Sequence, residues 1–112
     1  MSDDYRLKKE KDFDLVFKKG KRVYSSNLTL VYVGADNLKV GYAVGKKHGT
    51  SVKRNKIKRI LRESFRSFQP KIRQNFFFVF IPKVNGNLEL EKVKGEMEYL
   101  FTKIKVFGEE NA

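Results

Sequence analysis

The chain has 112 residues, of which 40% are hydrophobic and 34% are charged, and it contains no cysteine. This length and apolar content suit one compact domain over residues 1–112 with a single core. The lack of cysteine excludes disulfide bridges and thiolate metal sites, and we expect a cytoplasmic protein. No apolar run approaches the roughly 20 residues that span a bilayer, and the N-terminus lacks the apolar core of a signal peptide, so we expect no membrane partner.

The net charge is +12, from 25 Lys and Arg against 13 Asp and Glu. Repulsion of this size destabilises a compact chain, and a polyanionic partner is the usual reason to carry it. Residues 46–73 hold eleven basic side chains and one acid, Glu63, whereas residues 85–112 hold six Glu and four Lys. A charge that served only solubility would be spread more evenly, so the pattern indicates one nucleic-acid-binding face.

The first expected element is a short helix over residues 11–20. Phe13, Val16 and Phe17 share one face at helical spacing. Acidic residues gather at the start of this segment, and two lysines and Gly20 end it. This is the order that the helix dipole and a glycine C-cap favour.

Four strands are expected. Residues 23–25, 28–33 and 39–44 are rich in β-branched and aromatic side chains and are separated by turn residues. They predict three antiparallel strands, the last two joined as a hairpin. Residues 75–81, NFFFVFI, form a nearly all-apolar run before Pro82, which predicts a strand that is buried on both faces at the centre of the sheet.

Two further helices are expected, over residues 52–68 and 88–106. Thr50 or Ser51 caps the first, which ends before Pro70 and has an apolar stripe opposite a cationic arc. The second has apolar residues at helical spacing and is expected to pack over the sheet. The element order α-β-β-β-α-β-α predicts an α/β (α+β) two-layer sandwich, with helices against a four-stranded sheet.

The candidate binding residues lie in the basic helix and the loop before it. Guanidinium groups grip phosphates with two hydrogen bonds, and a rigid helix fixes their spacing against an RNA backbone. The alternative is a solvated charged face, but such faces normally mix acids and bases, and this helix has one acid. The candidate RNA-binding residues are Lys46, Lys47, Lys53, Arg54, Asn55, Lys56, Lys58, Arg59, Arg62 and Arg66.

Candidate catalytic residues are scarce. His48 is the only histidine, and in its glycine-flanked basic loop we expect an exposed or phosphate-contacting imidazole and not a general base. Asp12 and Asp14 are too few for a metal-dependent nuclease and lie on different helix faces. We therefore expect no catalytic residue, no metal and no cofactor in the chain itself.

The basic helix resembles the signature of the ribonuclease P protein subunit family, an Arg-Asn-Arg triplet followed by Lys-Arg and Arg at helical intervals. Lys56 keeps the charge of the second arginine of the triplet but not its bidentate contact. The resemblance extends over nearly the whole chain. In the basic helix it is carried by Arg54-Asn55-Lys56, Lys58-Arg59 and Arg62. Elsewhere it is carried by the segment from Leu7-Lys8 to Asp12-Phe13, by residues 16–20, by Val44-Gly45-Lys46-Lys47, and by the order of the elements.

This resemblance implies a left-handed βαβ crossover from the third strand through the basic helix to the fourth, an exception to the right-handed rule. It also implies two RNA partners and no DNA partner. One is the ribonuclease P RNA, which performs phosphodiester hydrolysis with bound magnesium. The other is the single-stranded 5′ leader of precursor tRNA, which the family binds in a cleft between the first helix and the sheet.

By position, Phe13 and Phe17 match the family's cleft aromatics, on which bases stack. The same spacing fits ordinary core residues of an amphipathic helix, so both interpretations stay open. For a third contact, counting from Gly20 without gaps gives Val31, and Tyr32 is its neighbour. Adjacent strand residues point to opposite faces, so we predict that Thr29 and Val31 line the cleft and that Tyr32 faces the other side.

The function that follows is that of a non-catalytic protein subunit of an endoribonuclease. The holoenzyme removes the 5′ leader from precursor tRNA, and the partner RNA carries the chemistry. A structural RNA-binding protein of ribosomal type is the alternative, because this fold and charge suit ribosomal RNA equally well.

Overall fold

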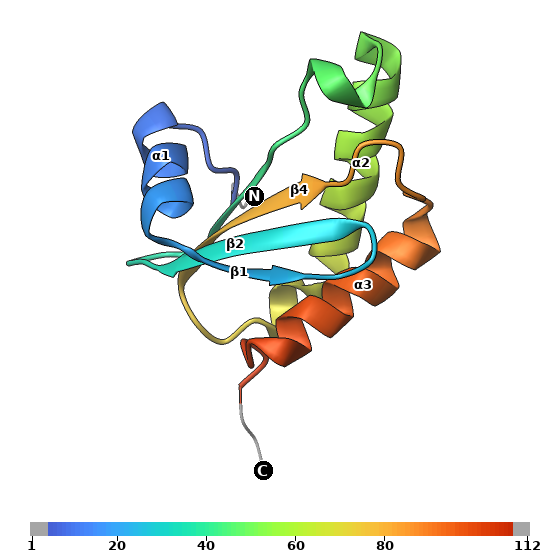
Figure 1. Cartoon of the computed structure of the whole chain (residues 1–112). Coiled ribbons are helices and arrows are strands. Elements are labelled where there is room, and N and C mark those ends of the chain that lie inside the picture. The colour runs from blue at the N-terminus through green and yellow to red at the C-terminus, as the bar shows by residue number, and fades with distance from the viewer. Residues whose placement is uncertain (1–4, 109–112) are drawn as a thin grey trace.

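The computed structural model describes residues 5–108, in which three helices and four strands follow one another in the expected order (Figure 1). Each predicted element exists, and the boundaries differ from the predicted ones by a few residues. The elements are α1 (Glu10–Lys19), β1 (Lys21–Tyr24), β2 (Leu28–Gly34), β3 (Lys39–Tyr42), α2 (Ser51–Phe68), β4 (Phe76–Pro82) and α3 (Leu90–Lys103), with short 3-10 turns at Lys46–His48 and Gln69–Lys71.

The four strands form one mixed sheet in the order β1-β2-β4-β3. β1 pairs with β2 and β2 with β4, both antiparallel, whereas β3 and β4 are parallel. The predicted hairpin between the second and third strands is therefore wrong, because β4 lies between them. β4 has a neighbouring strand on each side, and its consecutive residues Phe78, Val79 and Phe80 are fully buried, so both of its faces are covered. This confirms the central place predicted for residues 75–81.

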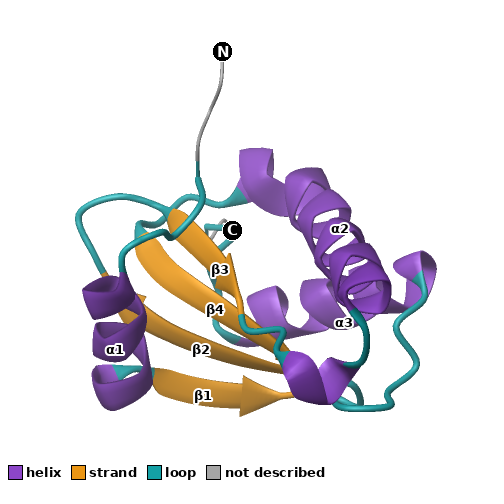
Figure 2. Cartoon of the chain, turned by 90° about the horizontal axis from the view of Figure 1, so that it is seen from above, coloured by secondary structure: helices purple, strands orange, loops and turns teal. Residues whose placement is uncertain are grey.

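The main core lies between one face of the sheet and the helices α2 and α3, which lie side by side in Figure 2. Phe101 of α3 is its centre: the side chain is fully buried, and its ring packs edge-on against the rings of Phe78 and Phe80 of β4 at centroid distances of 5.2 and 5.7 Å. From α2, Ile57, Leu61 and Phe65 fill the same layer. The helical stripe predicted from the sequence is thus the buried side of α2.

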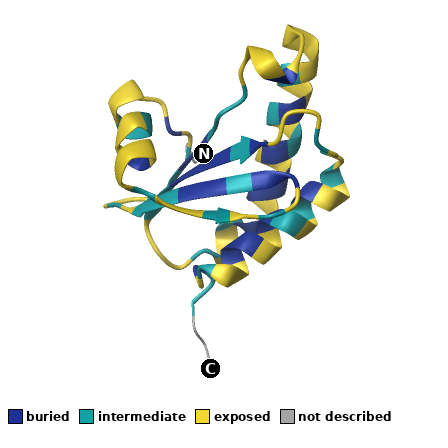
Figure 3. Ribbon diagram, viewed as in Figure 1, coloured by how far each residue is buried: buried dark blue, intermediate teal, exposed yellow. Residues whose placement is uncertain are grey.

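A smaller cluster lies on the opposite face of the sheet, where α1 packs alone. It consists of the buried Leu7, Val16, Val31 and Val79. Figure 3 shows the result on α1, which is exposed over most of its surface and buried along one side. Because α1 is a single short helix, it covers only part of this sheet face.

The N-terminal segment before α1 extends the sheet beside β3. The Leu7 N–H donates to the Val40 carbonyl at 2.8 Å, and the Val40 N–H donates to the Tyr5 carbonyl at 2.7 Å. The Gln69 side-chain amide also donates to the Tyr5 hydroxyl at 2.8 Å. These bonds hold the segment between β3 and the end of α2, an attachment that the sequence did not predict.

Candidate nucleic-acid interface

The outer side of α2 carries the cations predicted to bind RNA. The Thr50 hydroxyl caps the helix by accepting a hydrogen bond from the Lys53 N–H at 3.2 Å. The apolar stripe turns inward, so the cations are left on the outside. Lys53, Asn55, Lys56, Arg59, Arg62 and Arg66 are exposed, and Arg54 and Lys58 are partly buried.

The cations of α2 are not neutralised by the described part of the chain. Among residues 5–108, no carboxylate lies within ion-pair distance of Lys56, Arg59 or Arg62. The helix therefore presents a row of uncompensated positive charges. Such a row attracts phosphate groups, and counterion release favours their binding.

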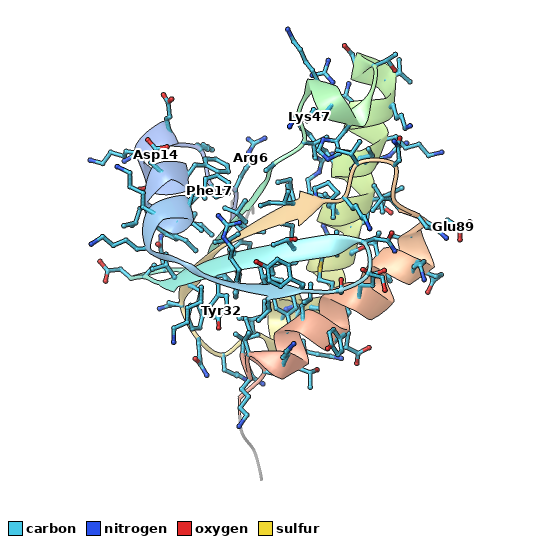
Figure 4. The ribbon with its side chains drawn as sticks, viewed as in Figure 1. Arg6, Asp14, Phe17, Tyr32, Lys47 and Glu89 are labelled. Carbon is cyan, nitrogen blue, oxygen red and sulfur yellow. The ribbon has the colours of Figure 1, made fainter. Side chains whose placement is uncertain are left out.

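A compact basic turn directly precedes α2 and carries Lys46 and Lys47, which are both exposed. Figure 4 shows Lys47 on this turn, near the start of α2. The turn ends at Gly49, whose φ of 119° lies in the region that disfavours residues with a Cβ atom. The Gly49 carbonyl accepts a hydrogen bond from the Arg54 Nε at 3.1 Å. The turn and the start of α2 thus form one continuous cationic surface.

His48 does not lie where the sequence indicated. The imidazole was expected to be exposed or to contact phosphate, but only 9% of the residue is exposed. Both ring nitrogens lie within hydrogen-bond distance of backbone atoms, at Gly45 and Pro82. The expectation was wrong because the partner on β4 is 34 residues away and leaves no local signal.

The predicted leader-binding residues lie on α1 and on the sheet face that α1 partly covers. The Phe13 ring lies directly over Gly41 of β3, where a Cβ atom would come within 2.5 Å of the ring. Phe17 is 36% exposed and projects from α1 toward the space above the sheet (Figure 4). Phe13 is therefore partly a core residue, whereas much of the Phe17 ring is open to solvent.

The side chains of β2 alternate between the two faces as expected. Val31 belongs to the cluster beneath α1, and Tyr32 packs on the other face against the main core. Val31 is fully buried, so it supports the floor under α1 and exposes no surface of its own. Thr29, two residues earlier on the same side of the strand, is partly exposed.

A groove of about 730 Å³ connects α1 with the cations of α2. One wall is formed by the N-terminal segment and Phe13, the floor by β3, and the other wall by α2. Phe13 and the α2 cations, assigned to separate binding regions from the sequence, therefore share one continuous depression. The groove is lined by Tyr5, Arg6, Leu7, Phe13, Val40, Gly41, Tyr42, Asn55, Lys58, Arg62, Phe65, Arg66 and Gln69.

Sequence reasoning missed several lining residues, among them Tyr42. Its hydroxyl is buried and has no hydrogen-bond partner within the described residues. Burial raises the pKa of the Tyr42 phenol well above its usual value, and the nearby Arg62 and Arg66 only partly oppose this effect. A tyrosine in an apolar strand gives no hint of such a site, because the arginines come from another element.

The chemical groups that meet here are cations, amides and aromatic rings. These suit the phosphates and bases of a single-stranded or folded RNA. Within residues 5–108, no group of three or more His, Cys, Asp or Glu side chains is placed to hold a metal ion. No helix in this part of the chain is long and apolar enough to cross a membrane.

Comparison with known proteins agrees with this geometry. The profile of the family described as Ribonuclease P matches residues 1–105. The chain is 32% identical to a "Ribonuclease P protein component" of an Exiguobacterium species, over 96% of both chains. A relative with the same name from Listeria welshimeri is 35% identical over 84% of this chain and 82% of its own.

Solved structures show the same fold. The ribonuclease P protein of Staphylococcus aureus superposes with a TM-score of 0.82 at 29% identity, covering 95% of this chain and all of that one. The protein of Thermotoga maritima superposes with a TM-score of 0.77 at 30% identity, covering 88% and 96%. The chain therefore belongs to the ribonuclease P protein family.

Proposed function

We propose that this chain, as the protein component of ribonuclease P in tRNA processing, binds the catalytic RNA through the basic turn and α2. The observation that carries this proposal is the row of exposed cations along one side of α2, which have no carboxylate partner among residues 5–108. A helix fixes the spacing of these groups before binding, so little conformational entropy is lost when phosphates dock. The residues assigned to this contact are Lys46, Lys47, Lys53, Arg54, Asn55, Lys56, Lys58, Arg59, Arg62 and Arg66.

The 5′ leader of precursor tRNA is assigned to the α1 face of the sheet. Phe17 offers an exposed ring on which a base stacks, and Phe13 offers the part of its ring that lines the groove. Thr29 lies farther along β2 and supplies a polar contact. Val31 acts from beneath, by packing under α1.

The chemistry is assigned to the partner RNA, with magnesium ions bound there. The protein contributes positive charge close to two polyanions that would otherwise repel each other. This contribution matters most where little magnesium or salt screens the phosphates. The protein is therefore expected to have its largest effect at low magnesium.

The test combines the purified chain with a bacterial ribonuclease P RNA and a 5′-extended precursor tRNA, at a magnesium concentration too low for the RNA alone. Cleavage at the mature 5′ end only when both components are present is expected. Lys94→Ala serves as a control, because it removes a cation from α3 and touches neither RNA-binding region. No stimulation by the chain, together with tight binding to ribosomal RNA fragments, would refute the proposal and favour a structural RNA-binding role.

A further inference from the structure

His48 is a buried polar side chain inside an otherwise exposed basic turn. The turn spans residues 45–49, and its two lysines point outward while the imidazole points inward. A buried imidazole is costly unless its ring nitrogens are satisfied. Here both nitrogens have backbone partners, which shows how the turn is attached to the rest of the fold.

The hydrogen bonds define the protonation state of the ring. The Gly45 N–H donates to Nδ1 at 3.1 Å, so Nδ1 carries no proton. Nε2 lies 2.8 Å from the Pro82 carbonyl oxygen, so Nε2 carries the proton and donates it to that oxygen. The neutral imidazole thus links the start of the basic turn to the end of β4, the central strand.

The same turn orients three cations. The His48 N–H donates to the Gly45 carbonyl at 2.9 Å and the Gly49 N–H to the Lys46 carbonyl at 3.1 Å, so the backbone that carries Lys46 and Lys47 is closed. The Gly49 carbonyl in turn holds the Arg54 guanidinium. Without the link to Pro82, the turn would keep its internal bonds but lose its anchor on the sheet.

We propose that His48 is a positioning residue for RNA binding, which fixes Lys46, Lys47 and Arg54 in place by anchoring their turn to the Pro82 carbonyl. The inference rests on the proposed function, because it assigns His48 a role in the same RNA contact. An anchored turn presents its cations at a set spacing. A turn without the link to Pro82 samples more conformations, and because RNA binding must then restrict them, it binds more weakly. His48 itself contacts no RNA in this account.

Two substitutions of His48 separate anchoring from simple space filling. His48→Phe fills the site and removes both hydrogen bonds, whereas His48→Gln keeps an amide N–H able to reach the Pro82 carbonyl. In the full chain, His48→Phe is expected to weaken binding to ribonuclease P RNA about tenfold, and His48→Gln is expected to recover much of that loss. Val93→Ala is the control, because it removes buried volume from α3 without touching the turn and leaves RNA affinity unchanged.

The deciding measurement is a double-mutant cycle. If His48 acts through the lysines, His48→Phe costs clearly less affinity in a chain that already carries Lys46→Ala and Lys47→Ala. Additive effects, or full affinity of both His48 variants, would overturn the inference. If His48→Phe does not fold, the same cycle is run with His48→Gln, whose partial loss must also shrink in the lysine-free background. Failure of the proposed function is a different result, since wild-type protein would then bind the RNA no better than the lysine variants do.

Discussion

The helices α2 and α3 cover the same face of the sheet, but they use their polar residues in different ways. On α3, the Glu96 carboxylate accepts hydrogen bonds from the Ser25 hydroxyl and from the backbone and side-chain amides of Asn27. On α2, the outward cations have no carboxylate partner in the described part of the chain. Polar groups on α3 therefore stabilise the fold, whereas those on α2 are left for a partner.

The difference explains how a chain with a net charge of +12 stays folded. The polar contacts that stabilise the fold join α3 to the β1–β2 turn, at Glu96, Ser25 and Asn27. The repulsive charges are gathered on α2 and the basic turn, and a polyanion relieves that repulsion when it binds. Substitutions near α3 should therefore change stability, and those on the outer side of α2 should change RNA affinity.

The largest expected effect is on stability, at Phe101 of α3. Phe101→Ala should lower the free energy of unfolding by about 3–5 kcal/mol, because it opens a cavity among the rings of the main core. Urea denaturation followed by circular dichroism measures the change. Tyr99→Ala on the same helix is the control, since Tyr99 is 53% exposed and its loss should cost far less. Equal losses at the two positions would contradict this account of the core.

The next effect is at Glu96. Glu96→Ala should lower the free energy of unfolding by about 2–3 kcal/mol, because it leaves the donors on Ser25 and Asn27 without their charged acceptor. Glu98→Ala is the matched control, an exposed carboxylate on the same helix. A comparable loss for Glu98→Ala would show that the hydrogen bonds are not the cause.

Glu96 should also make stability depend on pH. Burial alone would raise the pKa of its carboxyl group, but the hydrogen bonds from Ser25 and Asn27 outweigh burial and lower the pKa below its usual value. The folded state therefore binds the proton less readily than the unfolded state. The stabilisation is complete above the unfolded pKa and is lost as pH falls through the folded pKa. Denaturation at a series of acidic pH values should show that the free energy of unfolding falls more steeply with decreasing pH for the wild type than for Glu96→Gln.

Sequence patterns predicted the elements well where the signal is local. The apolar stripe on residues 52–68 identified the buried side of α2, and the apolar run at 75–81 identified the central strand. The hairpin error arose because a turn between two strands does not reveal whether they pair. Here β4 takes the place between β2 and β3, and no residue in the 35–38 connection indicates it.

The candidate binding surface combines residues that local patterns group together with residues that only the fold brings close. The cations of α2 are close together in sequence, so their common face follows from helical geometry. The groove brings together Tyr5, Phe13, Tyr42 and Gln69 from four separate segments, and His48 is held by a strand 34 residues away. Such contacts follow from tertiary packing, which has no periodic signature in the sequence.

A substitution on the α1 face, away from the cations of α2, should change binding of the 5′ leader and not of the rest of the tRNA. Phe17→Ala should weaken binding of a leader-containing precursor tRNA to the holoenzyme by about 1–2 kcal/mol, because one stacking surface is lost. Binding of mature tRNA, which has no leader, should not change. Leu15→Ala is the matched control, since Leu15 is 38% exposed on the same helix but lies two residues from Phe17, about 200° away around the helix axis. Equal weakening for precursor and mature tRNA would argue against a leader contact.

The smallest effect in free energy is expected for a single cation of α2. Arg59→Ala should leave the free energy of unfolding within about 0.5 kcal/mol, because the side chain is exposed and, within the described residues, has no carboxylate partner. It should lower the slope of log affinity for ribonuclease P RNA against log salt concentration by about one unit, as the loss of one phosphate contact requires. Lys94→Ala also removes one positive charge, but from α3, where Lys94 lies 4.0 Å from the Glu91 carboxylate, and it should leave the slope unchanged. If both variants reduced the slope equally, the charge would act through the net field of the protein and not through a face on α2.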